Sequence, residues 1–171
     1  MEENMISVPK PETSYIRLGI RSHAKGTFHE LVPAGKGLEV DTMYKVLANH
    51  LIVNITFAWE MAIALTDKND EGKLVSHRFP QFKFKDRFYP LFFKYDILNK
   101  RFQHEVVIAS PGGAGRNRVL KKNEFLAIKR YIPKNICEQQ KIAQTFFVLD
   151  NLITLHQRKL NTLKRIVVTI D

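Results

Sequence analysis

The chain has 171 residues, which is enough for one domain with a hydrophobic core and an appended element. Hydrophobic residues make up 44% and charged residues 26%, an ordinary balance that argues against a disordered chain. No apolar stretch reaches the roughly 18 to 20 residues that span a bilayer. The first residues also lack the basic and apolar regions of a signal peptide. We therefore expect a cytoplasmic protein with no segment that spans a membrane.

The net charge of +10 is concentrated in one part of the chain. Residues 73–134 carry 15 Lys and Arg against four Asp and Glu, whereas the rest carries 12 against 13. A localised positive field recruits polyanions, of which nucleic acid is the commonest. An anionic membrane surface and a solvated basic surface without a partner are the alternatives. The charge pattern favours nucleic acid, and we expect no membrane partner.

The first half of the chain predicts short strands separated by turns. Residues 14–20 are β-prone and partly alternating, and they predict a strand. Glycines and prolines between 26 and 37 indicate a loop with little room for a long helix. Residues 46–57 are rich in Val, Ile and Phe and predict one or two buried strands. A polar turn over 66–73 and a strand over 74–79 follow.

The second half predicts a strand, a helix and a closing segment. Residues 82–88 alternate Phe with Lys and Arg, as in a strand with one apolar and one basic face. Pro90 suits the first position of a helix, and apolar residues recur at helical spacing over 89–104. A glycine-rich loop over 110–115 and a mixed segment over 120–133 close the domain. We expect an α+β domain over residues 1–135, with a twisted sheet and short helices.

The character of the chain changes after Pro133, and residues 136–171 form the second unit that we expect. From Glu138 onwards there is no proline or glycine, and apolar side chains recur at alternating steps of four and three. This is the a/d pattern of a coiled coil. A helix over 138–167 would be about 45 Å long, too long to lie wholly on the domain. The expected seam consists of Ile142, Phe146, Leu149, Ile153, His156, Leu160, Leu163 and Val167.

We therefore expect this seam to pack against a second helix. The alternative is that the terminal helix packs wholly on the core of its own domain. Leu152 and Leu155 widen the apolar stripe beyond a strict seam, which indicates contacts with more than one surface. His156 in a seam position would set the register of the pairing, unless the helix splays there and leaves the ring in solvent.

Sequence signatures of catalysis are absent or weak. Cys137 is the only cysteine, so an internal disulfide and a multi-cysteine metal site are excluded. We expect it to be a buried or half-buried structural residue and not a catalytic thiol. The glycine-rich loop lacks the Gly-Lys-Ser/Thr of a phosphate-binding loop, and no two histidines have helical metal-site spacing. We expect no catalysis, no metal and no cofactor.

One pattern loosely fits a metal-dependent nuclease. Glu71 and Lys73, with Asp41 or Asp67 upstream, could place two carboxylates on a divalent ion and a lysine near the attacking water. The same residues lie in a run of turn formers, so a solvated turn explains them fully.

Basic residues that suit DNA recognition remain. Arg and Asn pair bidentately with guanine and adenine edges, and lysines neutralise phosphates. For any single residue, a surface cation without a role is the alternative. The residues that we predict to bind DNA are Arg78, Lys83, Lys85, Arg116, Asn117, Arg118, Lys121 and Lys122.

The segment from Ile132 onwards resembles the conserved region of the specificity (S) subunit of Type I restriction–modification enzymes. The similarity lies in Ile-Pro at 132–133, Glu-Gln-Gln-Lys-Ile-Ala at 138–143, Leu-Asp-Asn-Leu-Ile at 149–153 and Gln-Arg-Lys-Leu at 157–160. It is specific over about 40 residues and loose over about 120 upstream residues, where the strand SYIRLG and the segment LKKNEFLAIKRYIP are similar to the family's recognition domain.

This resemblance implies a non-catalytic DNA-recognition protein. A full S subunit has two target recognition domains, each reading half of a split DNA site, with two conserved helices packed antiparallel as a spacer. It recruits methyltransferase (M) subunits and, in the full complex, restriction (R) subunits. The present chain corresponds to one recognition domain and one helix, as in a natural half-length subunit, a fragment or a rearranged product.

Two hypotheses about assembly follow from this half-length plan. In the first, the chain forms a homodimer through antiparallel helices, reads a two-part palindromic site in double-stranded DNA and binds M subunits. In the second, it is a protein-interaction module, a decoy or assembly factor that binds a methyltransferase or a full S subunit and has little affinity for DNA.

Overall fold

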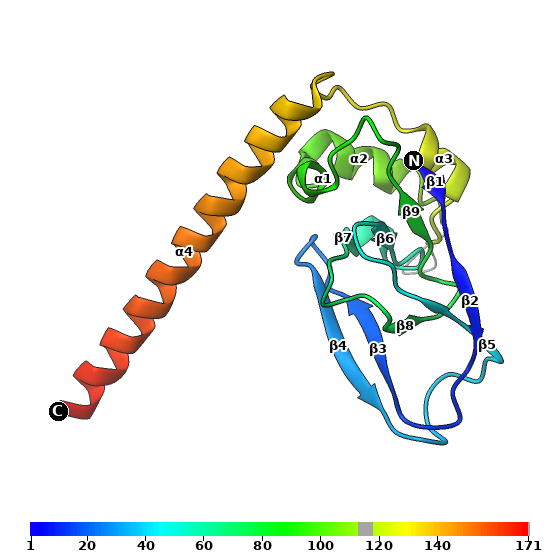
Figure 1. Cartoon of the computed structure of the whole chain (residues 1–171), viewed down its shortest axis with the longest axis horizontal. Coiled ribbons are helices and arrows are strands. Elements are labelled where there is room, and N and C mark those ends of the chain that lie inside the picture. The colour runs from blue at the N-terminus through cyan, green and yellow to red at the C-terminus, as the bar shows by residue number, and fades with distance from the viewer. Residues whose placement is uncertain (113–117, 171) are drawn as a thin grey trace.

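Two β-sheets form the centre of the domain (Figure 1). The computed structural model describes residues 1–112 and 118–170, and the side chains up to residue 165. The sheets have four and five strands, antiparallel except for the pair of β3 with β8. The first has the order β1 (Glu2–Glu3), β9 (Gln81–Lys83), β6 (Leu51–Val53) and β7 (Ile63–Leu65), and the second has β2 (Ile6–Pro9), β5 (Thr42–Lys45), β8 (Leu74–Val75), β3 (Tyr15–Ile20) and β4 (Thr27–Val32).

The four-stranded sheet is covered on both faces. Leu51 and Val53 of β6 belong to a core shared with the helices, whereas Ile52 between them packs into a core shared with the five-stranded sheet. Successive residues of a strand point to opposite faces, and because both faces are covered, all three side chains are buried. This explains the continuous apolar run from which buried strands were predicted, although only three of its residues form β6.

Three short helices cover the outer face of the four-stranded sheet. They are α1 (Pro90–Asp96), α2 (Lys100–Ile108) and α3 (Lys122–Ala127). The single helix predicted over 89–104 is wrong, because the chain leaves the helix near Leu98, which is 50% exposed. Asn99 has an extended backbone, and its side chain accepts a hydrogen bond from the Arg101 N–H, so it caps a second helix.

The remaining predictions for the domain have mixed outcomes. The strand over 14–20 is confirmed as β3 and the turn over 66–73 is confirmed, whereas the strand over 74–79 shortens to β8. Strand β4 lies in the segment predicted as a loop, and at the sheet edge most of its side chains are exposed. The alternation over 82–88 holds for buried Phe82 and Phe84, but the strand ends at Lys83.

A long helix, α4 (Ile136–Ile170), ends the described chain. Its 35 residues correspond to about 52 Å. Asn135 precedes it, and the Asn135 side chain accepts a hydrogen bond of 2.8 Å from the Cys137 N–H. Only its first turns are buried, and the rest leads away from the domain (Figure 1). The expected fold class, an α+β domain followed by a long helix, is confirmed.

Cys137 does not have the burial that we expected. It is an exposed free thiol, because the domain-facing side of α4 is formed by Gln139 and Ala143 and not by the first turn.

Among the described residues, no helix combines the length and the apolarity needed to cross a membrane.

Candidate nucleic-acid interface

The loop after β6 brings two predicted arginines together. The Arg78 Nη1 donates a hydrogen bond of 3.1 Å to the Thr56 Oγ1. The Arg118 guanidinium lies 5.6 Å from the centre of the Trp59 ring. The Trp59 Nε1 in turn donates to the Thr56 carbonyl at 3.2 Å. We call Thr56, Trp59, Arg78 and Arg118 the arginine cluster.

Backbone hydrogen bonds hold the three segments of the arginine cluster in place. The Ile55 N–H donates to the Arg78 carbonyl at 3.0 Å, and the Leu120 N–H donates to the Ile55 carbonyl at 2.8 Å. Asn54 fixes the turn, because its side chain accepts a hydrogen bond from the Thr56 N–H. Residues about 40 positions apart along the chain therefore share one surface.

The chemistry of the arginine cluster suits recognition of nucleic acid. Arg78 is exposed and Arg118 is partly exposed, so both guanidinium groups can reach a ligand. A guanidinium held over an aromatic ring keeps its donors available while its orientation is restricted. Arg is also the residue that most often reads guanine in the major groove. Thr56 and Trp59 were not predicted from the sequence, since nothing local connects them to the distant arginines.

Two further predicted residues, Arg116 and Asn117, lie outside the described residues. The described residues on either side of the gap, Gly112 and Arg118, form an antiparallel bridge.

The four predicted lysines are grouped around strand β1 instead, and acidic residues accompany three of them. Lys122 Nζ lies 2.8 Å from a carboxylate oxygen of Glu3, and Lys121 Nζ lies 2.9 Å from one of Glu124. Lys83 is the strand partner of Glu2. The ion pairs of Lys121 and Lys122, and the nearby Glu2, lower the local positive charge, so the lysines form a weaker electrostatic site than their sequence pattern indicated. The fourth predicted lysine of this group is Lys85.

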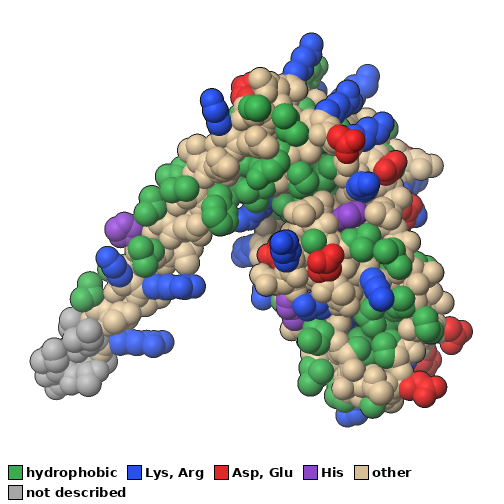
Figure 2. Space-filling model, in the orientation of Figure 1, with side chains coloured by type: hydrophobic (Ala, Val, Ile, Leu, Met, Phe, Trp, Pro, Cys, Tyr) green, Lys and Arg blue, Asp and Glu red, His purple; other side chains and the backbone are tan. Residues whose placement is uncertain are grey.

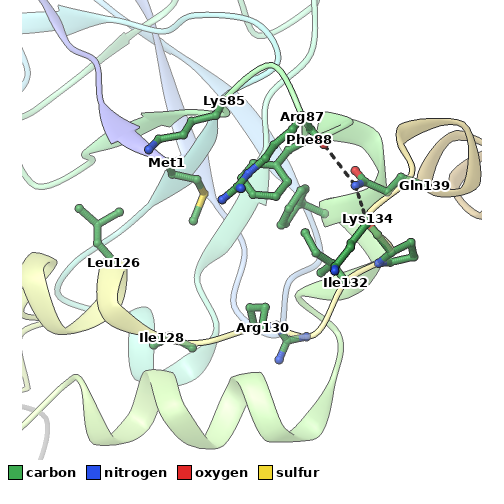
Figure 3. A pocket seen from close by; sticks show the side chains of 12 residues that line it. Met1, Lys85, Arg87, Phe88, Leu126, Ile128, Arg130, Ile132, Lys134 and Gln139 are labelled. Atoms are coloured by element: carbon green, nitrogen blue, oxygen red, sulfur yellow. Dashed lines mark hydrogen bonds between the residues drawn. The ribbon is translucent and has the colours of Figure 1, made fainter.

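Lys85 lines a pocket of about 620 Å³ between the domain and the start of α4 (Figure 3). Its other cationic residues include Arg87, Arg130 and Lys134. Arg130 is bound to Asp96, with its Nε 3.0 Å from the Asp96 Oδ2. Burial, and then the positive charge of Lys85, lowers the pKa of the Met1 amino group at the edge of this pocket. The apolar wall consists of Phe88, Phe93, Leu126, Ile128, Ile132 and Pro133.

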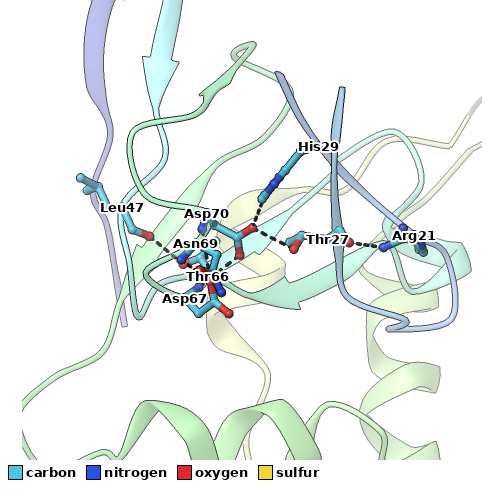
Figure 4. A network of polar contacts seen from close by, with 8 residues as sticks. All are labelled: Arg21, Thr27, His29, Leu47, Thr66, Asp67, Asn69 and Asp70. Carbon is cyan, nitrogen blue, oxygen red and sulfur yellow. Dashed lines mark hydrogen bonds and ion pairs between the residues drawn. The ribbon is translucent and has the colours of Figure 1, made fainter. Parts of the chain in front are cut away.

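Asp67, one of the residues of the possible nuclease site, and the neighbouring Asp70 have structural roles. The Asp67 Oδ1 accepts hydrogen bonds from the Asn69 N–H at 2.7 Å and the Asp70 N–H at 3.2 Å, which closes the turn (Figure 4). Buried Asp70 accepts from Thr27 Oγ1 and His29 Nε2 and fastens the β3–β4 hairpin. No group of three metal-ligating side chains occurs among the described residues. The interpretation of this segment as a turn is therefore the better one.

One face of α4 is held by the domain. Gln139 is 1% exposed, and its Oε1 accepts a hydrogen bond of 2.8 Å from the Tyr89 N–H at the start of α1. Ala143 is buried, and the Phe146 ring stacks on Tyr95 with their centres 5.2 Å apart. Asp150, one turn further along α4, contacts the same helix, α1.

The predicted seam of α4 lies mostly in solvent. Ile142 packs partly against the core, whereas Leu149, Ile153, Leu160 and Leu163 are 46% to 59% exposed. His156 is also exposed, and the side chain of Val167 lies outside the described residues. Figure 2 shows apolar side chains along the protruding part of α4. The alternative of a helix packed wholly on the core is therefore wrong, because a single chain leaves this surface uncovered.

The fold and these surfaces define a recognition module with a protruding helix, and comparison with known proteins identifies its family. A family model described as "Type I restriction modification DNA specificity domain" matches residues 10–165, so the chain belongs to this family. The description is that of a DNA specificity domain, so the chain is a DNA-recognition component and not an enzyme. The resemblance noted in the sequence is thereby confirmed.

A solved structure supports the same fold. The chain is similar to the HsdS subunit from Thermoanaerobacter tengcongensis with a TM-score of 0.69 and 13% sequence identity. The alignment covers 91% of this chain and 41% of that subunit, so the chain spans less than half of its length. A search of curated proteins found no match.

Proposed function

We propose that the chain acts as a half-length specificity subunit whose arginine cluster reads one half of a two-part DNA site. The observation that carries this proposal is the exposed apolar seam of α4, which needs a second helix. In this arrangement residues 1–135 form the recognition unit and residues 136–171 form the spacer. The rest of the proposal follows from how two such helices would pair.

A second copy of the chain fits the seam of α4. The seam residues follow one another at steps of four, three, four, three, four, three and four, a series that is identical in both directions. Two antiparallel copies can therefore place every seam residue opposite another, as a two-fold interface requires. Leu149 would face Leu160 of the second copy, and Ile153 would face His156 near the two-fold axis.

Such a dimer would hold two identical recognition domains at opposite ends of a spacer. A spacer of about 45 Å corresponds to about 13 base pairs at about 3.4 Å per step. Because the two domains are related by a two-fold axis, the preferred DNA site would be a palindrome of two separated halves. Arg78 and Arg118 would approach base edges, and the lysines around β1 would approach phosphates.

Methyltransferase docking is proposed on a second apolar stripe of α4. Val148, Leu152 and Leu155 are 54%, 47% and 50% exposed. At about 100° per residue, this stripe lies about 100° around the helix from the seam. One partner helix covers one stripe, so the second stripe remains available to a different protein. We assign it to an M subunit, with R subunits joining the complete enzyme.

Selection from random DNA duplexes tests the proposed function. The full chain is incubated with the library at a stated salt concentration, with and without a cognate M subunit, and bound duplexes are sequenced. We expect enrichment of a two-part palindrome at a fixed spacing, strengthened by the M subunit. Enrichment of single half-sites, or of no sequence at all under both conditions, would contradict the proposal.

The protein-interaction module remains a second candidate because of the ion pairs of Lys121 and Lys122. Both lysines have carboxylate partners, which weakens the basic surface for DNA. The dependence of affinity on salt separates the two functions. Binding through several phosphates falls steeply as salt rises, whereas helix pairing with a methyltransferase depends on it much less.

A further inference from the structure

Helix α4 makes polar side-chain contacts with the domain at two places on one of its faces, in addition to the buried Ala143 and the stacked Phe146. The first is Gln139, whose side-chain amide contacts the Tyr89 N–H and also donates to the Pro133 carbonyl at 2.8 Å. The second is Asp150, 11 residues and about 16 Å further along the helix. Two points define a direction, so the second attachment determines where the protruding part of α4 points.

The second attachment consists of side chains from a single helix, α1. The Asp150 Oδ2 accepts hydrogen bonds from the Tyr95 hydroxyl at 3.1 Å and from the Lys94 Nζ at 3.2 Å. Phe146, one turn earlier, stacks on the Tyr95 ring. We call the contacts of Lys94 and Tyr95 with Asp150 the latch.

A cleft beside the latch leaves α4 room to move. It has a volume of about 460 Å³, and Asp150 and Tyr95 line it together with Gly26 of the β3–β4 loop, Thr27 of β4 and Leu65 of β7. In this region α4 is therefore not packed tightly against the sheets. Lys94 and Asp150 are 45% and 49% exposed, so their pair contributes little to the stability of the fold. Its main physical effect is to restrict the angle of α4.

A small change of this angle has a large effect at the end of α4. The 20 residues after Asp150 extend about 30 Å. A rotation of about 10° moves a point at that distance by about 5 Å, more than one base-pair step of about 3.4 Å. In a two-fold dimer the partner domain moves with the helix that carries it.

We propose that Asp150 is a positioning residue that determines the spacing between the two half-sites, by holding α4 in one direction through Tyr95 and Lys94. This inference rests on the proposed function, because it presupposes a dimer that reads a two-part site. It adds a specificity determinant that touches no DNA.

Binding to a series of spacings tests the inference. The selected half-sites are placed in duplexes whose spacers differ by single base pairs, and affinities of the wild type and of Asp150→Ala are compared. A change of two base pairs turns one half-site by about 70° relative to the other. We expect the wild type to lose about tenfold or more in affinity for this change, and Asp150→Ala to lose about threefold or less.

Matched variants separate positioning from general damage. Gln157→Ala alters an exposed residue two turns further on the same face and should keep the wild-type profile. The double variant Lys94→Glu with Asp150→Lys restores an ion pair of reversed polarity and should recover a narrow profile. An unchanged narrow profile in Asp150→Ala, or a broad one in Gln157→Ala, overturns the inference.

A distance measurement tests the latch without DNA. Spin labels are attached at Lys36→Cys and Asn161→Cys in a Cys137→Ser background, and labelled chains are diluted with unlabelled protein. We expect Asp150→Ala to broaden the distribution of distances between the labels. If no two-part site exists but the distribution broadens, the proposed function fails and the latch stands. An unchanged distribution refutes the latch.

Discussion

The side chain of Gln139 and the backbone of Tyr89 form a hydrogen bond of 2.8 Å that joins residues 50 positions apart. The Gln139 Oε1 satisfies the N–H of Tyr89, the residue immediately before α1, and its Nε2 donates to the carbonyls of Pro133 and Arg87. Because the start of a helix leaves backbone N–H groups unpaired, a buried amide here joins α4 to the domain. Gln139 belongs to the segment Glu-Gln-Gln-Lys-Ile-Ala at 138–143 that resembles the family, but the sequence alone did not indicate its structural role.

The first prediction is that Gln139→Ala destabilises the domain strongly. Gln139 is 1% exposed, and its removal leaves the Tyr89 N–H and two carbonyls without their partner. We expect a loss of about 2 to 4 kcal/mol in the free energy of unfolding, measured with urea. Gln144→Ala, at an exposed position of α4, should stay within about 0.5 kcal/mol of the wild type. Equal effects of the two variants would show that the buried amide has no special role.

A second prediction concerns Asp70, which fastens the edge hairpin. Its carboxylate is 2.9 Å from the Thr27 Oγ1 and 2.8 Å from the His29 Nε2, and it also accepts from the Asp67 N–H. Asp70→Ala should lower the free energy of unfolding by about 2 to 4 kcal/mol. Exposed Glu71 provides the control, since Glu71→Ala should have almost no effect. DNA cleavage that requires magnesium and disappears in Glu71→Ala would revive the nuclease alternative.

The third prediction addresses DNA binding by the arginine cluster. Arg78→Ala and Arg118→Ala should each weaken binding to the selected site by about 1 to 3 kcal/mol and relax the base preference at one position. Lys121→Ala provides the comparison, because a phosphate contact carries no base preference and Lys121 is also paired with Glu124. It should lower the affinity less than either arginine variant and alter no base preference. Unchanged affinity and preference in both arginine variants would remove these residues from the interface.

The long helix could be predicted from the sequence because its signals are local. Pro133 precedes it, proline and glycine are absent from it after Glu138, and the apolar spacing continues for several turns. The strand β4 could not be predicted in the same way. It is a sheet edge with mostly exposed side chains, so it has no alternating apolar pattern, and its pairing with β3 supplies the order instead.

The arginine cluster shows why the site could be predicted only in part. Arg78 and Arg118 were proposed from residue type and charge, which are visible in the sequence. Their proximity depends on the backbone of Ile55, which bonds to both neighbouring segments, and on the ring of Trp59. The ion pairs of Lys122 with Glu3 and of Lys121 with Glu124 likewise arise from the fold. The charge counted along the chain therefore overestimated the positive charge that the lysines contribute to the surface. It also gave no indication that Trp59 orients Arg118.

A fourth prediction follows from the environment of the Tyr95 hydroxyl. Burial, with the hydrogen bond and negative charge of Asp150 as further causes, raises the pKa of Tyr95 to about 12. The folded chain therefore favours the protonated phenol. Its contribution to stability is present below pH 10, the usual pKa of tyrosine, and is lost as the pH rises towards about 12.

Ultraviolet titration of the phenolate absorbance checks this pKa. We expect the titration to include a late phase, which belongs to Tyr95. Tyr95→Phe should abolish the late phase, and Asp150→Asn should move it towards lower pH. Tyr131→Phe, at a position that is 89% exposed, should leave it in place. A late phase that persists in Tyr95→Phe would assign the raised pKa to another residue.

The last prediction concerns pairing through the seam of α4. In an antiparallel dimer each substitution occurs twice, so Leu149→Ala removes two leucine side chains from the interface. Burial of a leucine contributes about 1.5 to 3 kcal/mol, and we expect the dimer Kd to rise by about 100-fold or more in sedimentation equilibrium. His156→Leu should have the opposite effect, because it replaces a polar ring opposite Ile153 with an apolar side chain. Asn151→Ala lies on the polar side of α4 and should leave the Kd within about threefold of the wild type. A wild-type chain that stays monomeric at micromolar concentration, with α4 unprotected in hydrogen exchange, would rule out the homodimer.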